Sequence, residues 1–118
     1  MENGSIVITF LPQADGVPKN RPALLLCRSA PFGDFVVAGI SSQLHRALEG
    51  ADEIIAESDP DFPATRLSTS SVVRTLYLAT IPSSRIKGTM GHVSKERLQR
   101  IYQSLETHFS NLKTRKGS

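Results

Sequence analysis

Residues 21–27 read Arg-Pro-Ala-Leu-Leu-Leu-Cys, and this apolar run constrains the fold more than any other part of the chain. Because Leu24, Leu25 and Leu26 follow one another, a strand here has apolar side chains on both faces and is expected at the centre of a sheet. Proline disfavours helical geometry in the residue before it, which holds Arg21 extended at the start of that strand. A planar, permanently charged donor group at the edge of a core suits the binding of a phosphate. Nucleic-acid chemistry is therefore the first hypothesis to test.

Other β-rich runs predict several short strands, mostly antiparallel because the loops between them are short. The expected strands are residues 5–10, 23–28, 35–40, 53–56, 72–74 and 77–81. The strand at 53–56 is expected at an edge, because charged residues flank it. Prolines and a glycine predict an irregular loop over residues 11–20, and residues 43–49 have helical character.

The C-terminal region has the clearest helical pattern. Ser94 is the expected N-cap, and Glu96 in the first turn favours the helix dipole. Apolar residues at helical spacing form one stripe, which we expect to dock on the sheet: Leu98, Ile101, Tyr102, Leu105, Phe109 and Leu112. The other side of the helix is polar: Lys95, Arg97, Arg100, Gln103 and Glu106. Residues 1–112 are thus expected to form a single domain, a small mainly β barrel with a C-terminal helix, and residues 113–118 a flexible basic tail.

Charge is unevenly distributed along the 118 residues. Residues 49–61 contain six acidic residues and no Lys or Arg, so the rest of the chain has 14 basic and 5 acidic residues. A basic body suits an anionic partner, either RNA or an acidic peptide. A solvated surface of mixed charge explains the same numbers.

Cysteine content and hydropathy limit the kinds of protein to which this chain can belong. Cys27 is the only cysteine and lies in an apolar strand, so packing is its expected role. A disulfide within the chain and a cysteine zinc site are both excluded. No apolar stretch approaches the ~20 residues that span a bilayer, so no membrane association is expected. No secretory signal is visible, so the cytoplasm is the expected location.

Several short motifs occur in an order typical of one known family. They are Gly4 with Ile6-Val7, residues 21–26, residues 36–43, Leu67 with residues 71–74, Thr80-Ile81, and residues 90–94. In this order they resemble the MazF/PemK family of toxin endoribonucleases from bacterial toxin–antitoxin pairs. The resemblance implies an SH3-like barrel of the MazF/CcdB kind, closed by a C-terminal helix and acting as a homodimer. It also implies cleavage of single-stranded RNA without metal or other cofactor, and neutralisation by a cognate antitoxin.

The resemblance further implies a catalytic pair, namely the arginine of the Arg-Pro-Ala motif and a threonine that ends the third strand. By position these residues are Arg21 and Ser41. Serine keeps the hydroxyl of the family's threonine but lacks the branch that stiffens χ1. Some members carry a glutamate in the loop before the arginine, where this chain has Gly16 beside Asp15.

Metal-free RNA cleavage requires the ribose 2′-OH to attack its own phosphorus, which gives a cyclic phosphate and a free 5′-OH. Arg21 can donate two aligned hydrogen bonds to the phosphate and Ser41 can add a third, and such preorganised stabilisation is usually the largest contribution to catalysis. A structural ion pair for Arg21 and strand-end capping for Ser41 are the alternatives. Arginine is a poor proton acceptor near neutral pH, so His45 and Asp15 are the candidate general acids or bases.

Further polar residues near these motifs are candidates for contacts with the RNA backbone, or are simply solvated: Lys19, Asn20, Ser42, Gln43, Arg46 and Arg74. A second class of function stays open. A weak or inactive member of the same fold could bind nucleic acid or a protein such as a topoisomerase, as a gyrase poison does. Ser41 in place of threonine and Gly16 in place of glutamate motivate this alternative.

Overall fold

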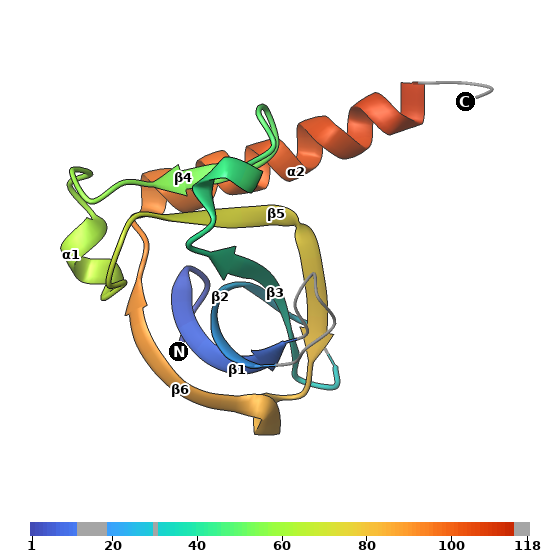
Figure 1. The fold of residues 1–118 in the computed structure, drawn as a ribbon. Helices are drawn as coiled ribbons and strands as arrows, with labels where there is room; N and C mark the ends of the chain where they lie inside the picture. The colour runs from blue at the N-terminus through green and yellow to red at the C-terminus, as the bar shows by residue number, and fades with distance from the viewer. Residues whose placement is uncertain (12–18, 30, 115–118) are drawn as a thin grey trace.

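The computed structural model describes residues 1–11, 19–29 and 31–114, with side chains to Leu112. In these ranges six strands form one antiparallel sheet in the order β4-β5-β3-β2-β1-β6. They are β1 (Ser5–Leu11), β2 (Lys19–Ser29), β3 (Asp34–Ser41), β4 (Glu53–Ile55), β5 (Ser71–Ile81) and β6 (Ile86–His92). The helical elements are η1 (Leu44–Arg46), α1 (Phe62–Thr65), η2 (Ser83–Arg85) and α2 (Lys95–Thr114). The strands curl around one another and α2 lies alongside β4 and β5, which confirms the predicted mainly β fold with a C-terminal helix (Figure 1).

Strand β2 is central and separates two groups of buried side chains, as its apolar run predicts. The helix-side core consists of Ile6, Leu24, Leu26, Ala38, Ile40, Ile55, Leu67, Val73, Val93, Leu98 and Ile101. The opposite core consists of Val7, Leu11, Ala23, Leu25, Phe35, Val37 and Ile81. Leu24 and Leu25 fall in different cores because successive side chains of a strand point to opposite faces.

Cys27 is exposed, so the predicted packing role is wrong. Leu25 pairs with Val37 of β3, whereas Cys27 pairs with Val36, so Leu26 is an extra residue in β2. A bulge of this kind interrupts the regular alternation of a strand. The apolar pattern does not reveal the bulge, which is why it predicts a packed cysteine.

Strand β5 is continuous, although the sequence predicts two separate strands at 72–74 and 77–81. Arg74 pairs with Gly39 of β3 and Leu78 pairs with Ala38, so residues 75–77 are additional in β5. The strand bends sharply along its length (Figure 1). The two predicted strands are thus parts of one bent strand.

The remaining predictions of secondary structure are partly confirmed. β4 is an edge strand, as its charged flanks indicate. Residues 43–49 contain only the single turn η1, and β6 and α1 are not predicted at all. The expected irregular loop over residues 11–20 is shorter, since β1 includes Leu11 and β2 begins at Lys19, and residues 12–18 lie outside the described ranges.

Helix α2 begins as predicted, because the backbone N–H of Arg97 donates to Ser94 Oγ at 3.1 Å. Leu98 and Ile101 are buried in the helix-side core, but Phe109 and Leu112 are 52% and 49% exposed. A helix of 20 residues is about 30 Å long, and its C-terminal part extends past the sheet (Figure 1). The apolar stripe therefore docks only in its first half.

The C-terminal end of α2 also bears on two earlier expectations. The helical backbone continues to Thr114, and residues 115–118 of the expected basic tail lie outside the described ranges. No helix in those ranges has the length and apolar character needed to cross a bilayer.

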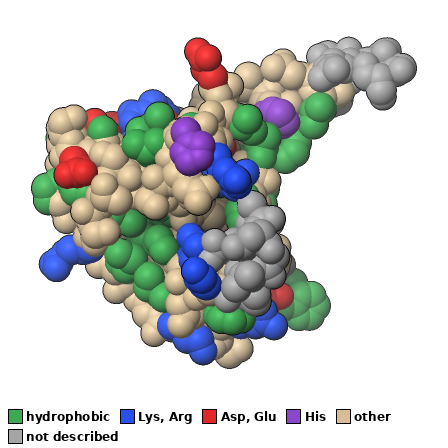
Figure 2. Space-filling model, in the orientation of Figure 1, with side chains coloured by type: hydrophobic (Ala, Val, Ile, Leu, Met, Phe, Trp, Pro, Cys, Tyr) green, Lys and Arg blue, Asp and Glu red, His purple; other side chains and the backbone are tan. Residues whose placement is uncertain are grey.

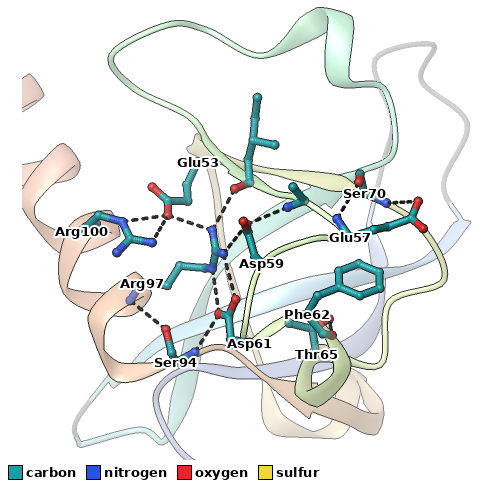
Figure 3. Close-up of polar contacts among 12 residues, drawn as sticks. Glu53, Glu57, Asp59, Asp61, Phe62, Thr65, Ser70, Ser94, Arg97 and Arg100 are labelled. Carbon is teal, nitrogen blue, oxygen red and sulfur yellow. Dashed lines mark hydrogen bonds and ion pairs between the residues drawn. The ribbon is translucent and has the colours of Figure 1, made fainter.

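Arg97 is buried, although the helical pattern predicts it on the polar side of α2. Its side chain is 4% exposed and forms ion pairs with three carboxylates (Figure 3). The closest contacts are 2.9 Å to Glu53, 2.8 Å to Asp59 and 2.8 Å to Asp61. A fourth acceptor is the carbonyl of Ile54, 2.8 Å from Nη1. Part of the acidic segment 49–61 therefore neutralises a buried arginine.

The hydrogen bonds from Arg97 lower the pKa of Asp61 well below its usual range, and the N–H of Ser94 adds to this effect against the opposing influence of burial. The same pairing raises the pKa of Arg97. The pKa of Asp59 is lowered by the backbone N–H of Ala56 and by Arg97. All three groups stay charged at neutral pH, so the cluster joins α2 to β4 and to the chain before α1.

Candidate functional site

Arg21 and Ser41 lie at the same end of the two central strands. Arg21 is the third residue of β2 and Ser41 is the last residue of β3. Ala23 pairs with Gly39, and this antiparallel register, continued by two residues along each strand, places Arg21 opposite Ser41. Residues opposite one another on one face have Cβ atoms about 4.5–5.5 Å apart. Continued in this way, the register puts the two predicted residues at neighbouring strand positions at this end of the sheet.

The guanidinium of Arg21 lacks partners for one of its nitrogens and for its charge among the described residues. Its side chain is half-buried, and its Nε atom is buried without a hydrogen-bond partner within the described residues. No ion pair to Arg21 occurs among them either. A buried donor without an acceptor is rare and costs free energy, and a catalytic role, a bound water or ion, or strain accounts for such groups in proteins. The structural ion pair considered from the sequence is not present in this part of the chain.

The hydroxyl of Ser41 has one internal contact. Its Oγ accepts a hydrogen bond from the backbone N–H of Gln43 at 3.1 Å, so the strand-end capping considered from the sequence does occur. A hydroxyl can accept and donate at once. The hydrogen of Ser41 Oγ has no acceptor among the described residues, and it can be donated to a bound phosphate. Ser42 and Gln43 follow in an exposed turn.

Tyr77 of β5 covers the backbone of Gly39, and Arg74 lies over the ring of Tyr77. A Cβ atom at Gly39 would lie 2.9 Å from Cδ2 of Tyr77, so only glycine fits beneath this ring. The guanidinium carbon of Arg74 lies 5.7 Å from the centre of the same ring. Arg74 is therefore held two residues from Ser41 along the pairing register. The sequence gives no signal for the Gly39–Tyr77 contact, because the contact depends on the bend in β5.

Asp52 connects the segment that follows β3 to the bend in β5. Its Oδ1 accepts the backbone N–H of Thr75 at 3.0 Å, and its Oδ2 accepts the N–H of Leu48 at 2.9 Å. His45 and Arg46 of η1 lie in the segment and are exposed. In the described residues no hydrogen bond connects His45 to Arg21 or Ser41. Asp15, the other candidate acid or base, lies outside these residues, as does Gly16.

Lys19 and Asn20 are the first two residues of β2, and both are exposed. They pair with Leu11 and Phe10 of β1, directly before Arg21. Figure 2 shows Lys and Arg side chains gathered near the centre of one face of the molecule, with a His side chain beside them. Within the described ranges, no three His, Cys, Asp or Glu side chains are grouped as a metal-binding site.

Comparison with known families identifies the chain. The family described as "PemK-like, MazF-like toxin of type II toxin-antitoxin system" matches residues 2–109. The chain belongs to this family. The resemblance that the sequence motifs carry is therefore confirmed. No curated protein matches the chain.

Solved structures of MazF toxins share the fold of this family member. The Mycobacterium tuberculosis toxin MazF-mt6 is 22% identical with a TM-score of 0.69, and the match covers 90% of this chain and 96% of that one. An endoribonuclease from a mycobacterial species, in complex with its cognate antitoxin, is 17% identical with a TM-score of 0.69 and coverage of 93% and 95%. MazF in the MazE–MazF structure from Deinococcus radiodurans is 15% identical with a TM-score of 0.65 and coverage of 92% and 94%. At these identities the likeness shows the fold: the predicted MazF-like barrel with its C-terminal helix is confirmed.

Proposed function

We propose that this toxin is a metal-independent endoribonuclease that cleaves single-stranded RNA. Family membership supports RNA cleavage in general, and two similar structures are named as endoribonucleases. One observation carries the assignment to this site: the Nε of Arg21 is buried without an acceptor among the described residues. The β2–β3 register, continued from the Ala23–Gly39 pair, leads from Arg21 to Ser41. An RNA phosphate supplies the missing acceptor, and the guanidinium fork matches two of its oxygens.

The proposed reaction is an internal transesterification. The 2′-oxygen of the ribose forms a bond to the adjacent phosphorus, the bond to the 5′-oxygen breaks, and the products end in a cyclic phosphate and a 5′-OH. Arg21 and Ser41 donate hydrogen bonds to the phosphoryl oxygens, where negative charge increases in the transition state. One proton leaves the 2′-OH and one reaches the 5′-oxygen. His45 is our candidate proton carrier, because imidazole titrates near neutral pH, and Asp15 is the second candidate.

The polar residues around this pair are proposed to contact the RNA, mainly through its backbone. Contacts to phosphates raise affinity and salt sensitivity but add little base preference. The residues are Lys19, Asn20, Ser42, Gln43, Arg46 and Arg74.

A cognate antitoxin is the proposed protein partner, since two of the similar structures contain a toxin with its antitoxin. We also propose that the toxin acts as a homodimer in the cytoplasm. The exposed apolar side chains Phe109 and Leu112 suit an interface with a second copy. Light scattering of the purified protein tests this, and a monomer at micromolar concentration would contradict it.

The decisive experiment incubates the protein with single-stranded RNA in the presence of a chelator. Arg21→Ala is expected to lower the cleavage rate about 10²- to 10³-fold, the usual effect of removing one preorganised donor. Ser41→Ala is expected to have a smaller effect, because Arg21 remains. Ser41→Thr keeps the hydroxyl and should retain activity. Arg28→Ala is the matched control, since Arg28 is an exposed arginine near the other end of β2.

Two outcomes of this experiment would contradict the proposal. One is RNA that stays intact with the wild-type protein, and the other is equal cleavage by Arg21→Ala. Fragments that a polynucleotide kinase labels without prior phosphatase treatment confirm the free 5′-OH.

A non-catalytic toxin on the same fold is the second candidate, because the hydroxyl of Ser41 already caps the strand end. Induced expression separates the two. Growth arrest with fragmented RNA supports the endoribonuclease, whereas arrest with intact RNA and damaged DNA supports a topoisomerase poison.

A further inference from the structure

A second group of polar and aromatic side chains lies near Arg21. Phe10, Asn20, Ser84, Arg85 and Lys87 line a depression of about 390 Å³, named here the Phe10 depression. Phe10 is 45% exposed, so part of its ring is accessible to a ligand. The lining contains two cations, an amide and a hydroxyl but no carboxylate.

A buried threonine fixes the depression next to the candidate catalytic strand. Thr9 pairs with Arg21 of β2 on one side and with Ile86 of β6 on the other. Its hydroxyl donates to the carbonyl of Arg85 at 2.9 Å, and its side chain is completely buried. The backbone of η2 is thereby held against β1, one strand away from Arg21. Neighbouring strands are about 4.8 Å apart.

The alternation of side chains separates the two sites. Phe10 and Asn20 are paired across β1 and β2, as are Thr9 and Arg21 one position along. The first pair therefore lies on the opposite face of the two strands from the second pair. The Phe10 depression is therefore separate from the position that the Arg21 side chain contacts.

The chemistry of the lining matches a single nucleotide. The exposed ring of Phe10 offers a stacking surface, which every base can use, and Asn20 lies directly across from it with hydrogen-bonding groups for a base edge. Arg85 and Lys87 are exposed, and neither forms an ion pair with any described residue. Free cations beside an exposed aromatic ring are the usual means of binding single-stranded nucleic acid.

We infer that the Phe10 depression binds one nucleotide of the RNA outside the cleavage position. Its base stacks on Phe10, Asn20 contacts the base edge, and Arg85 and Lys87 bind its phosphate. The inference rests on the proposed function, since it names how the same substrate is held. The depression supplies affinity and a modest base preference, whereas Arg21 and Ser41 supply the chemistry.

A fluorescence experiment tests the stacking without cleavage. The chain has no tryptophan, so Phe10→Trp introduces the only indole. A 2′-O-methyl RNA lacks the attacking 2′-OH and stays intact during the titration. We expect this RNA to quench the fluorescence of the Phe10→Trp variant and a base-free nucleotide at one position to relieve the quenching. Phe32→Trp is the matched control, because Phe32 is 84% exposed in the turn between β2 and β3, and the fluorescence of that variant should stay constant.

Affinity measurements test the same site in the otherwise native protein. Phe10→Ser should weaken binding of the 2′-O-methyl RNA about 5- to 20-fold, the loss of one stacked base, and Phe10→Trp should preserve it. Lys87→Ala should reduce the dependence of log K on log salt by about 0.7, the value for one phosphate of a single strand. Lys95→Ala, at an exposed lysine on α2, should leave the slope unchanged. Circular dichroism checks that each variant is folded.

The outcomes separate this inference from the proposed function. If the wild-type protein cleaves RNA but Phe10→Ser binds it equally well, or RNA does not quench the Phe10→Trp variant, the inference is overturned and the proposed function stands. If a purified antitoxin, and not RNA, changes the fluorescence of that variant, the depression is a protein-binding site and the inference is overturned. A wild-type protein that neither binds nor cleaves RNA removes the proposed function and, with it, the inference.

Discussion

Arg97 and Arg21 are two arginines of one fold with very different surroundings. Arg97 donates hydrogen bonds to three carboxylates and a backbone carbonyl, and all its side-chain nitrogens have partners (Figure 3). Arg21 has a buried Nε with no acceptor among the described residues. The first guanidinium is fully hydrogen-bonded within the protein, whereas the second has an unpartnered Nε within the part of the chain that the structure describes.

The difference follows from what lies around each arginine. Arg97 meets an acidic segment whose carboxylates come from β4 and the chain before α1, whereas Arg21 is paired across β1 and β2 with Thr9, which carries no charge. A buried charge with full pairing supports the structure, because removing one partner leaves the others uncompensated. A charge without pairing costs stability, and proteins keep such groups where function needs them.

The largest effect on stability is expected at Arg97. Arg97→Met leaves the partly buried Asp61 without its counter-charge and Glu53 with only the exposed Arg100, so the free energy of unfolding should fall by about 3–5 kcal/mol. Urea denaturation measures this loss. Arg100→Met is the control, because Arg100 contacts the same Glu53 but is 56% exposed, and such pairs contribute at most about 1 kcal/mol. Equal losses in both variants would show that burial does not distinguish the two arginines.

A slightly smaller loss is expected where β6 contacts α1, the short helix that follows Asp61. A Cβ atom at Gly91 would lie 2.2 Å from the carbonyl oxygen of Ala64, and backbone atoms on both sides must shift to accommodate it. Gly91→Ala should therefore lower the free energy of unfolding by about 3 kcal/mol. Gly88→Ala in the same strand meets no atom within 4 Å and should have little effect. Thermal melting of the two variants provides the comparison.

The contribution of Asp61 should depend on pH. Its pKa is lowered in the folded protein by Arg97 and by the N–H of Ser94, so its stabilisation is complete above the ordinary aspartate pKa of about 4. The stabilisation decreases as the pH falls below that value, because the folded protein then takes up a proton at greater cost than the unfolded chain. Asp61→Asn should lose about 2 kcal/mol at pH 7, and the difference from wild type should narrow between pH 4 and pH 2. A constant difference over this range would contradict the assignment.

The smallest change in stability is expected at Arg21. Arg21→Met removes a buried donor without an acceptor among the described residues, so the free energy of unfolding should stay constant or rise by up to about 1 kcal/mol. RNA cleavage by the same variant should be lost. A fall in stability comparable to that of Arg97→Met would mean that Arg21 has a structural role, and it would remove the contrast between the two arginines.

The sequence alone determined the features of this protein that depend on a local pattern of residues, namely single strands, a helix cap and the family. The consecutive leucines of residues 24–26 require a central strand, the charges around residues 53–56 mark an edge, and Ser94 caps a helix. The ordered motifs identify the MazF/PemK family, and the proline after Arg21 fixes that residue in a strand. Each of these depends on neighbours in the chain or on spacing within one element.

Tertiary structure decided the environment of each charge. Arg97 is on the polar side of a helical pattern, yet it is buried because carboxylates about 36–44 residues earlier in the chain surround it. The bulge in β2 exposes Cys27, and the bend in β5 places Tyr77 on Gly39. The Phe10 depression combines residues of β1, β2, η2 and β6, and an isolated Arg85-x-Lys87 pair gives only a weak signal for it. Local spacing predicts the strand or helix in which a residue lies. The partners of its side chain come from distant segments, and these partners decide whether a charge stabilises the fold or remains available for a ligand.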